Sequence, residues 1–208
     1  MDIQFYGANC VTLTYQGVRM VVDDNLTELG AKSITRAGDV ALFTGAHATP
    51  AVETKLIIDG PGEYEVSAFS VFGIPARAHI DEPGHFDTTM YRLVAGDIRI
   101  LVTGHVYPEF SESQLEKIGT IDVVIIPVGG NGYTLDPAGA LGIIKEIEPR
   151  LVIPTHFDDS SLNFPVPQQT LDQAIKTLGV EPSPAVNKLK LKPSELTDVL
   201  RVAILDRS

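Results

Sequence analysis

The sequence predicts a mixed α/β fold in which helices pack outside stacked β-sheets. Short apolar runs typical of strands fill the first half of the chain, strands then alternate with helices, and strand-like runs return near the C-terminus. This order favours layered sheets covered by helices over a pure β-sandwich or a helical bundle. The 208 residues show no internal repeat and no convincing domain boundary, so we expect a single domain over residues 1–208.

The first half of the chain is predicted to be mostly sheet. Apolar and polar residues tend to alternate between Ile3 and Asp23, and Gln16-Gly17 interrupts them where a hairpin turn is expected. Glycine or proline separates the short apolar runs that follow. These runs predict strands at residues 40–44, 54–59, 68–74, 91–95 and 98–103.

Helix signals appear in the second half of the chain. Ser111 offers an N-cap for a short helix that Gly119 ends. Asp136-Pro137 caps and starts a second helix between two apolar, strand-like runs. The remaining predicted elements are buried strands at 121–127 and 151–154, a helix at 168–178, a proline-rich connection, and terminal strands at 189–191 and 200–205.

The composition argues against several classes of protein. Lysine and arginine number 16 against 27 aspartate and glutamate, which gives a net charge of −11, and no basic patch is evident, so we expect no nucleic-acid partner. The first residues lack the basic n-region of a signal peptide, so we expect no export. No apolar run approaches the ~20 residues that span a bilayer, so we expect no insertion into a membrane. Cys10 is the only cysteine, which excludes an intramolecular disulfide and a cysteine-based zinc cluster. A cytoplasmic location is the simplest expectation.

Three of the five histidines come directly after predicted strands. His47, His105 and His156 each lie just past the C-terminal end of a short apolar run. Loops at the ends of core strands are where α/β folds usually assemble their sites, so convergence of these histidines is expected. Imidazole binds zinc, iron and related metals well, which makes a metal site the first hypothesis. Taken singly, each is better explained as a satisfied or solvated loop histidine, and the recurrence of three in the same setting weakens that explanation.

Segments spread along most of the chain carry a resemblance to a known family. They are Gly7-Ala8-Asn9-Cys10-Val11, Val21-Val22-Asp23-Asp24, Asp59-Gly60-Pro61-Gly62-Glu63-Tyr64-Glu65, the stretch from Val128-Gly129-Gly130 through Tyr133-Thr134-Leu135-Asp136-Pro137, and Ile153-Pro154-Thr155-His156-Phe157. In combination they resemble metallo-β-lactamase-fold proteins, in the branch of small cytoplasmic hydrolase-like proteins related to L-ascorbate-6-phosphate lactonase. The resemblance implies a four-layer αββα sandwich with a metal site at one sheet edge. It also implies self-association, since relatives in this branch form oligomers.

The metal-binding motif of that family is broken in this sequence. Active members carry Thr-His-x-His-x-Asp-His after a strand, whereas this chain has Thr44-Gly45-Ala46-His47-Ala48-Thr49-Pro50 and keeps only the second histidine. The family's early Gly-His is Gly7-Ala8 here. By the resemblance, His79 and His156 occupy the third and last histidine positions, and His105 replaces the bridging aspartate.

The departures from the motif bear on how many metal ions could bind. A two-metal hydrolase holds a hydroxide between its ions, which needs the bridging carboxylate and enough ligands on both metals. We therefore expect no binuclear centre. Two alternatives remain: a single bound ion of zinc, manganese or iron, or no metal at all. A single ion would lie either in a closed structural site of four histidines or in a catalytic site of three histidines with one free coordination position. The candidate ligands are His47, His79, His105 and His156.

Other candidate sites carry weaker signals. His85 and Asp87 lie in a turn-rich segment that would line a pocket or simply face solvent. Glu63 is interpreted as a turn residue with a structural hydrogen bond rather than as a general base. The glycine-rich stretch 128–132 follows a strand and would let a phosphate approach backbone N–H groups, although it lacks the Lys and Ser/Thr of a phosphate loop. The remaining interpretations are structural: Asp136 as an N-cap, and Asp23 and Asp24 as turn residues beside the site.

The resulting functional hypothesis is a cytoplasmic hydrolase-like protein whose binuclear metal site has been dismantled and which lacks ordinary di-zinc hydrolysis. Two alternatives stay open. One is a mononuclear metal-dependent hydrolase of small phosphoesters or lactones that uses the remodelled histidines, and the other is a non-enzymatic binding or scaffold protein. A small-molecule ligand or substrate and further copies of the chain are the expected partners. The sequence does not reveal the substrate, the metal or whether catalysis occurs.

Overall fold

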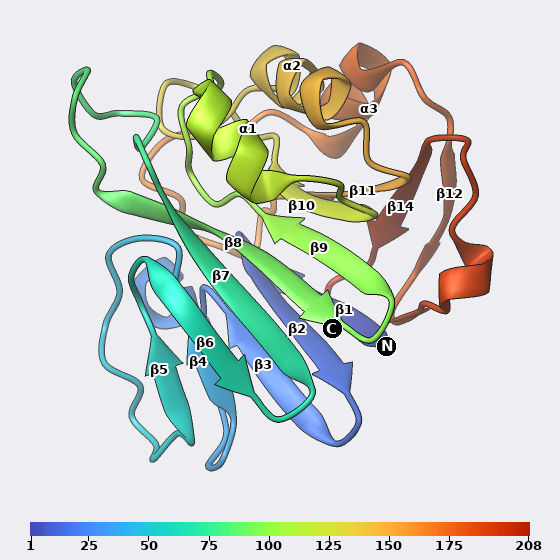
Figure 1. The fold of residues 1–208 in the computed structure, drawn as a ribbon. Coiled ribbons are helices and arrows are strands. Elements are labelled where there is room, and N and C mark those ends of the chain that lie inside the picture. The colour runs from blue at the N-terminus through green and yellow to red at the C-terminus, as the bar shows by residue number, and fades with distance from the viewer.

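The structure, a computed structural model, describes residues 1–208 and is built around two facing β-sheets (Figure 1). One sheet has six strands and the other has eight. Three α-helices gather on the outer side of the eight-stranded sheet (Figure 1). The predicted α/β fold of stacked sheets covered by helices is therefore confirmed.

The six-stranded sheet comes mainly from the first part of the chain. An antiparallel meander of three strands continues into two parallel strands, and a short strand from near the C-terminus pairs with β1. The predicted hairpin turns at Gln16-Gly17, where both residues have positive φ angles of 46° and 80°. In spatial order the strands are β13 (Leu189–Lys190), β1 (Asp2–Gly7), β2 (Cys10–Tyr15), β3 (Val18–Val22), β4 (Val40–Leu42) and β5 (Leu56–Ile58).

The eight-stranded sheet combines an antiparallel half with a parallel half. Strands β6 to β9 pair antiparallel, whereas β9, β10, β11, β14 and β12 pair parallel. In spatial order the strands are β12 (Pro182–Val186), β14 (Arg201–Leu205), β11 (Leu151–Thr155), β10 (Val123–Pro127), β9 (Ile98–Val102), β8 (Thr88–Ala95), β7 (Phe69–Ala76) and β6 (Gly62–Val66).

The two edge strands of this sheet were not predicted from the sequence. β12 contains two prolines and reads as a connection, but an edge strand tolerates proline because one side of it needs no ladder hydrogen bonds. β6 carries Glu63, whose interpretation as a turn residue is wrong, since Glu63 is exposed in this strand and pairs with Phe72 of β7. Edge strands need less apolar content than buried ones, which explains why both were missed.

Side-chain caps fix where the helices begin. Ser111 and Gln114 form a reciprocal capping box at α1 (Glu112–Ile118), and Asp136 accepts a hydrogen bond from the Gly139 amide, at 2.7 Å, at the start of α2 (Pro137–Ile147). The third helix, α3 (Leu171–Leu178), starts later than predicted because Thr170 is its N-cap. None of these helices has both the length and the apolar character needed to cross a membrane.

Two apolar clusters hold the layers together. The larger one, with 26 buried residues, fills the space between the two sheets, and the second, with 19, lies between the eight-stranded sheet and the helices. The outer side of the six-stranded sheet is covered more thinly, by the 3-10 helix η1 (Leu26–Leu29) and loop residues that pack on Cys10 and Val21. The fourth layer of the sandwich is therefore a short 3-10 turn with loops.

One edge of the sandwich collects the ends of several strands. β3 and β4 run parallel in the first sheet, and β9, β10 and β11 run parallel in the second. Parallel strands bring their C-terminal ends to the same side, so the segments that follow them meet. This meeting point, together with the turn between β1 and β2, forms the candidate site.

Candidate functional site

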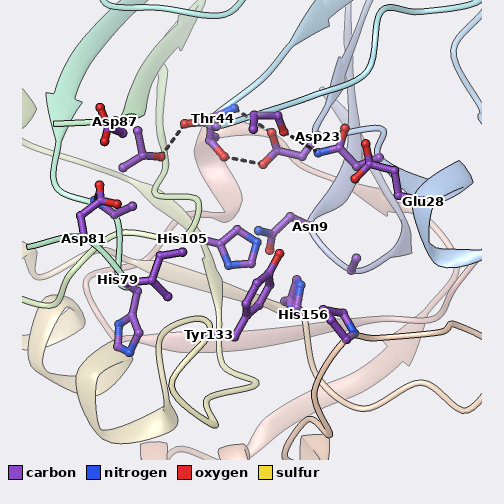
Figure 2. A pocket seen from close by; sticks show the side chains of 18 of the residues that line it. Asn9, Asp23, Glu28, Thr44, His79, Asp81, Asp87, His105, Tyr133 and His156 are labelled. Carbon is purple, nitrogen blue, oxygen red and sulfur yellow. Dashed lines mark hydrogen bonds between the residues drawn. The ribbon is translucent and has the colours of Figure 1, made fainter. Parts of the chain in front are cut away.

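A cavity of about 340 Å³ opens at this edge, between the ends of the two sheets (Figure 2). Its lining combines imidazoles, carboxylates and a tyrosine with amide and hydroxyl groups. The polar side chains that line it are Asn9, Asp23, Asn25, Glu28, Thr44, His79, Asp81, Asp87, Thr88, His105, Tyr133 and His156. Three of the predicted metal ligands are in this set, and the fourth, His47, is outside it.

His105 and His156 form the centre of the inner wall. Their ring centroids are 4.6 Å apart and their planes are nearly perpendicular, at 84°. The Tyr133 ring lies 5.3 Å from the His105 ring and 6.1 Å from the His156 ring. These three side chains come from the segments after β9, β10 and β11, so the predicted convergence at the strand ends is confirmed for His105 and His156.

Two glycines let the backbone bring these histidines together. Gly104, just before His105, has a φ of +63°, and any side chain at this position would collide with Thr44. Gly129 lies against the backbone carbonyl of His156 and the side chain of Gln168, so a methyl group there would overlap both. The glycine-rich loop after β10 is thus explained by close packing around His156.

Gln168 sets the tautomer of His156. The Gln168 side-chain nitrogen donates to the Val166 carbonyl at 2.8 Å, which orients the amide so that its oxygen faces His156 Nδ1 at 3.2 Å. Because that oxygen only accepts, Nδ1 carries the proton and donates it. The other ring nitrogen, Nε2, keeps its lone pair.

Both imidazoles of the inner wall are uncharged at neutral pH. Burial lowers the pKa of His105 to about 3, assisted by the neighbouring His156 and His79. Burial also lowers the pKa of His156 to about 4, although the hydrogen bond to Gln168 opposes this shift. The pair therefore offers neutral nitrogen atoms rather than positive charge.

A buried aspartate joins the two sheets at the top of the cavity. Asp23 follows β3 with a φ of 46° and accepts hydrogen bonds from the Thr44 amide and the Thr44 hydroxyl, both at 2.7 Å. The Thr44 carbonyl in turn accepts from the Thr89 amide, at 2.8 Å, and from the Thr88 hydroxyl (Figure 2). Burial raises the pKa of Asp23 to about 6 in spite of the two bonds from Thr44.

His47 is turned away from this cavity. Its ring stacks on Phe43 with the centroids 3.8 Å apart and an interplanar angle of 8°. Its Nε2 lies 3.3 Å from an Asp59 carboxylate oxygen, and its Nδ1 lies 2.9 Å from the Ala48 carbonyl. Both ring nitrogens are thus engaged outside the cavity.

His79 lines the cavity but does not join the imidazole pair. Figure 2 shows its ring directed away from His105. The ring centroids of His79 and Tyr107 are 6.1 Å apart. Its Nδ1 is buried without a hydrogen-bond partner. No group of three or more His, Cys, Asp or Glu side chains is arranged to hold a metal ion. The side chains as they stand do not fit a two-metal centre, and metal binding by His47, His79, His105 and His156 stays a prediction.

The candidates with weaker sequence signals differ in whether they line the cavity. Asp87 lines the cavity, while His85 is exposed with its Nδ1 4.0 Å from Asp87. Glu63 lies in β6 and outside the cavity. Asp24 closes the loop beside the site, as predicted, by accepting hydrogen bonds from Ser33, Ile34 and Thr35.

Several residues in or beside the cavity were not identified as functional candidates from the sequence, among them Glu28 and Asp81. Asn9 reaches the site from the β1–β2 turn, Tyr133 comes from the loop after β10, and Gln168 lies behind His156. Asn9 and Tyr133 both lie in segments that carried the family resemblance, which was a usable signal. No local sequence pattern identifies Gln168 as a residue of the site.

Comparison with known proteins agrees with the fold. A protein of Salinibacter ruber named as a UPF0173 metal-dependent hydrolase is 24% identical over 207 residues, covering 83% of this chain and 89% of that protein. One of Exiguobacterium sp. with the same name is 27% identical over 194 residues, covering 76% and 86%. The crystal structure of a metallo-beta-lactamase superfamily protein from Thermotoga maritima superimposes with a TM-score of 0.75 at 24% identity, covering 99% of this chain and 98% of that one.

The family assignment rests on the larger part of the chain. Residues 2–156 match the family described as beta-lactamase superfamily domain, a span that runs from β1 to His156 at the end of β11. The narrower relation to L-ascorbate-6-phosphate lactonase stays a prediction. Since the match covers well over half of the sequence, the chain belongs to the beta-lactamase superfamily, in its metallo-β-lactamase-fold form.

Proposed function

We propose that this protein is a hydrolase-like superfamily member that lacks a two-metal centre and uses its cavity to bind a small molecule. One observation carries the proposal. The segment Thr44–Pro50, where the family motif places its metal ligands, contributes only Thr44, Gly45 and Ala46 to the cavity lining. Gly45 and Ala46 have no side-chain donor atom, and His47 is held outside by Phe43 and Asp59.

The remaining carboxylate does not restore the missing ligands. Hydrolysis by two metals requires groups that hold both ions and the hydroxide between them. Asp23 is the buried carboxylate of the cavity, and both of its oxygens already accept hydrogen bonds from Thr44. Its structural task, linking the ends of β3 and β4 to β8, is sufficient to explain its burial.

A second candidate, a mononuclear metal-dependent hydrolase, is favoured by a different observation. The Nδ1 atoms of His79 and His105 are buried without partners, and His156 has a free lone pair on Nε2. Relatives at 24% and 27% identity are named metal-dependent hydrolases. One ion of zinc, manganese or iron held by these three residues would act as a Lewis acid on a phosphoester or lactone.

Metal content decides between the two candidates. The protein, purified after growth with added zinc and manganese, is compared by elemental analysis with a His105→Ala/His156→Ala variant. His47→Ala is the matched control, because it removes an imidazole that lies outside the cavity. The proposal predicts no stoichiometric metal in any of the three proteins and no hydrolysis of phosphoesters or lactones.

Each other result has a defined meaning. One metal ion per chain, lost in the double variant and kept in His47→Ala, supports the mononuclear hydrolase instead. Loss in His47→Ala as well indicates the four-histidine site predicted from the sequence. Two ions per chain contradict the proposal outright. The cytoplasmic location and self-association of the chain stay predictions, which fractionation and sedimentation can check.

A further inference from the structure

The charge of the cavity lining is strongly one-sided. Asp23, Glu28, Asp81 and Asp87 all line the cavity, and no lysine or arginine does. Figure 2 shows Asp81 and Asp87 on one side of Thr44 and Asp23 with Glu28 on the other. Carboxylates on a low-dielectric wall focus a negative potential into the space between them, which attracts cations and repels anions.

The histidines do not offset this charge. The histidine–carboxylate pairs of the chain are His47–Asp59 and His85–Asp87, so neither His105 nor His156 is paired with a carboxylate of the lining. A phosphate or carboxylate group of a ligand would therefore meet carboxylates and no charged partner. The chain as a whole is also acidic, with a net charge of −11.

An unused hydrogen-bond donor provides a second, independent sign of a ligand. Asn9 is only 7% exposed, and its side-chain oxygen accepts a hydrogen bond from the Thr155 hydroxyl at 2.9 Å. With this contact made, Nδ2, a donor, is left without any partner. A buried unpaired donor costs about 1–3 kcal/mol, which an acceptor oxygen of a bound molecule would offset.

An unpaired imidazole nitrogen belongs to a second residue of the same lining. His105 Nδ1 is buried without a partner and, in a neutral ring, one nitrogen is an acceptor. Among simple ligand groups, a hydroxyl both accepts a hydrogen bond and donates one, so it matches the types of group left unpaired on Asn9 and His105. Tyr133, 5.3 Å from His105, adds an aromatic ring to the same wall, and aromatic faces attract cations.

We propose that the cavity binds a small organic cation, a primary ammonium group next to a hydroxyl, and that it rejects phosphate-bearing molecules. This inference rests on the proposed function, because it assumes that no pair of metal ions neutralises the carboxylates. The carboxylates of Glu28, Asp81 and Asp87, which Thr44 does not occupy as it does Asp23, attract the ammonium group, while Asn9 and His105 hold the hydroxyl. A metal ion is the less suitable cation, since no three ligand side chains converge.

The test is an NMR titration of the full chain with four probes. They are 2-aminoethanol, ethylamine, 1,2-ethanediol and inorganic phosphate. We expect saturable shifts of the Asn9 side-chain amide and of the His105 imidazole with 2-aminoethanol, at a roughly millimolar Kd suited to so small a ligand. Ethylamine and 1,2-ethanediol should each bind at least about fivefold more weakly, and phosphate should not bind.

Two variants test the role of charge. Glu28→Gln/Asp87→Asn removes two exposed carboxylates from the cavity rim, and we expect the Kd for 2-aminoethanol to rise about fivefold to tenfold, as two partly screened ionic contacts allow. The matched control, Asp97→Asn/Glu146→Gln, makes the same change in charge at two exposed positions outside the lining and should change the Kd less than about twofold.

The outcomes separate this inference from the proposed function. Binding of phosphate as tight as that of 2-aminoethanol, equal weakening by both double variants, or no saturable shift with any amine overturns the inference. Elemental analysis of the same sample checks the proposed function alone. Two metal ions per chain would refute that function, whereas a metal-free chain that ignores amines would refute only the ligand class.

Discussion

The inner wall of the cavity and the segment after β4 contrast two outcomes of one sequence pattern. His105 and His156 follow strands of the eight-stranded sheet and face each other with their rings 4.6 Å apart. His47 follows a strand of the six-stranded sheet, yet it stacks on Phe43 and binds Asp59 outside the cavity. A histidine after a strand end is therefore not enough to make a site, because the direction of the chain after the strand decides where the ring goes.

The supporting contacts explain the difference. His156 is held by backbone and side-chain neighbours from three separate segments, namely Ala8, Gly129 and Gln168. His47 is held by Phe43, only four positions earlier in the chain, and by Asp59, whose side chain is 58% exposed. A rigid surrounding shell is what keeps functional side chains in place, and only the inner wall has one.

The largest effect of any single group is expected from breaking the inner wall at Gly129. In Gly129→Ala the new methyl group would overlap the His156 carbonyl and the Gln168 side chain, and we expect a loss of about 3 kcal/mol in the free energy of unfolding. Gly142→Ala is the control, because Gly142 is exposed in α2 with no atom near its added methyl group. That variant should gain roughly 0.5–1 kcal/mol. Urea unfolding measures the free energy of unfolding of both variants. If Gly129→Ala loses less stability than a typical surface substitution does, the packing described here is contradicted.

Acid should weaken the inner wall next. The pKa values of His105 and His156 are lowered in the folded state, so the unfolded chain binds more protons below pH 6.5 and stability is lost as the pH falls toward 4. Between pH 7 and pH 5 we expect each imidazole to remove about 2 kcal/mol. NMR provides the direct check, because neither ring should titrate above pH 5. A midpoint at pH 6 for either ring would refute the assignment.

Asp23 should oppose that loss by a smaller amount. Its pKa is raised in the folded state, so the folded chain binds the extra proton and gains stability as the pH falls through 6. This gain is about 1 kcal/mol between pH 7 and pH 5. Asp23→Asn removes it, so the variant should lose about 1 kcal/mol more than the unmodified protein over the same interval in urea unfolding. An equal or smaller loss would show that Asp23 is ionised at pH 5.

The smallest effect is expected from His47→Ala. The change removes an aromatic stacking contact and a partly exposed ionic contact, which together account for about 0.5 kcal/mol of stability. The NMR signals of His105 and His156 should stay where they are. A shift of either ring would show that His47 communicates with the cavity and would remove the contrast between the two regions.

The sequence predicted most of the fold because the fold follows from local patterns. Apolar alternation located the meander and the hairpin at Gln16-Gly17, and the caps Ser111 and Asp136 placed the first two helices. The third helix starts later than predicted because Thr170 and Gln173 form its capping box, so Gln168 lies before the helix. β6 and β12 were missed because edge strands carry little apolar signal.

The amino-acid sequence alone establishes that three histidines follow strand-like runs, that Gly45, Thr49 and Pro50 stand in the segment compared with the family motif, and that there is a single cysteine. The tertiary structure decided the rest. Asn9 and Thr155 are 146 residues apart in sequence and meet in a hydrogen bond, and that meeting is what leaves a donor unpaired in the cavity. The tertiary structure also turned His47 away from the cavity and gathered four carboxylates around the cavity without a lysine or arginine. Local patterns specify strands and caps, whereas the direction of a side chain and the charge around it depend on distant segments that only packing brings into contact.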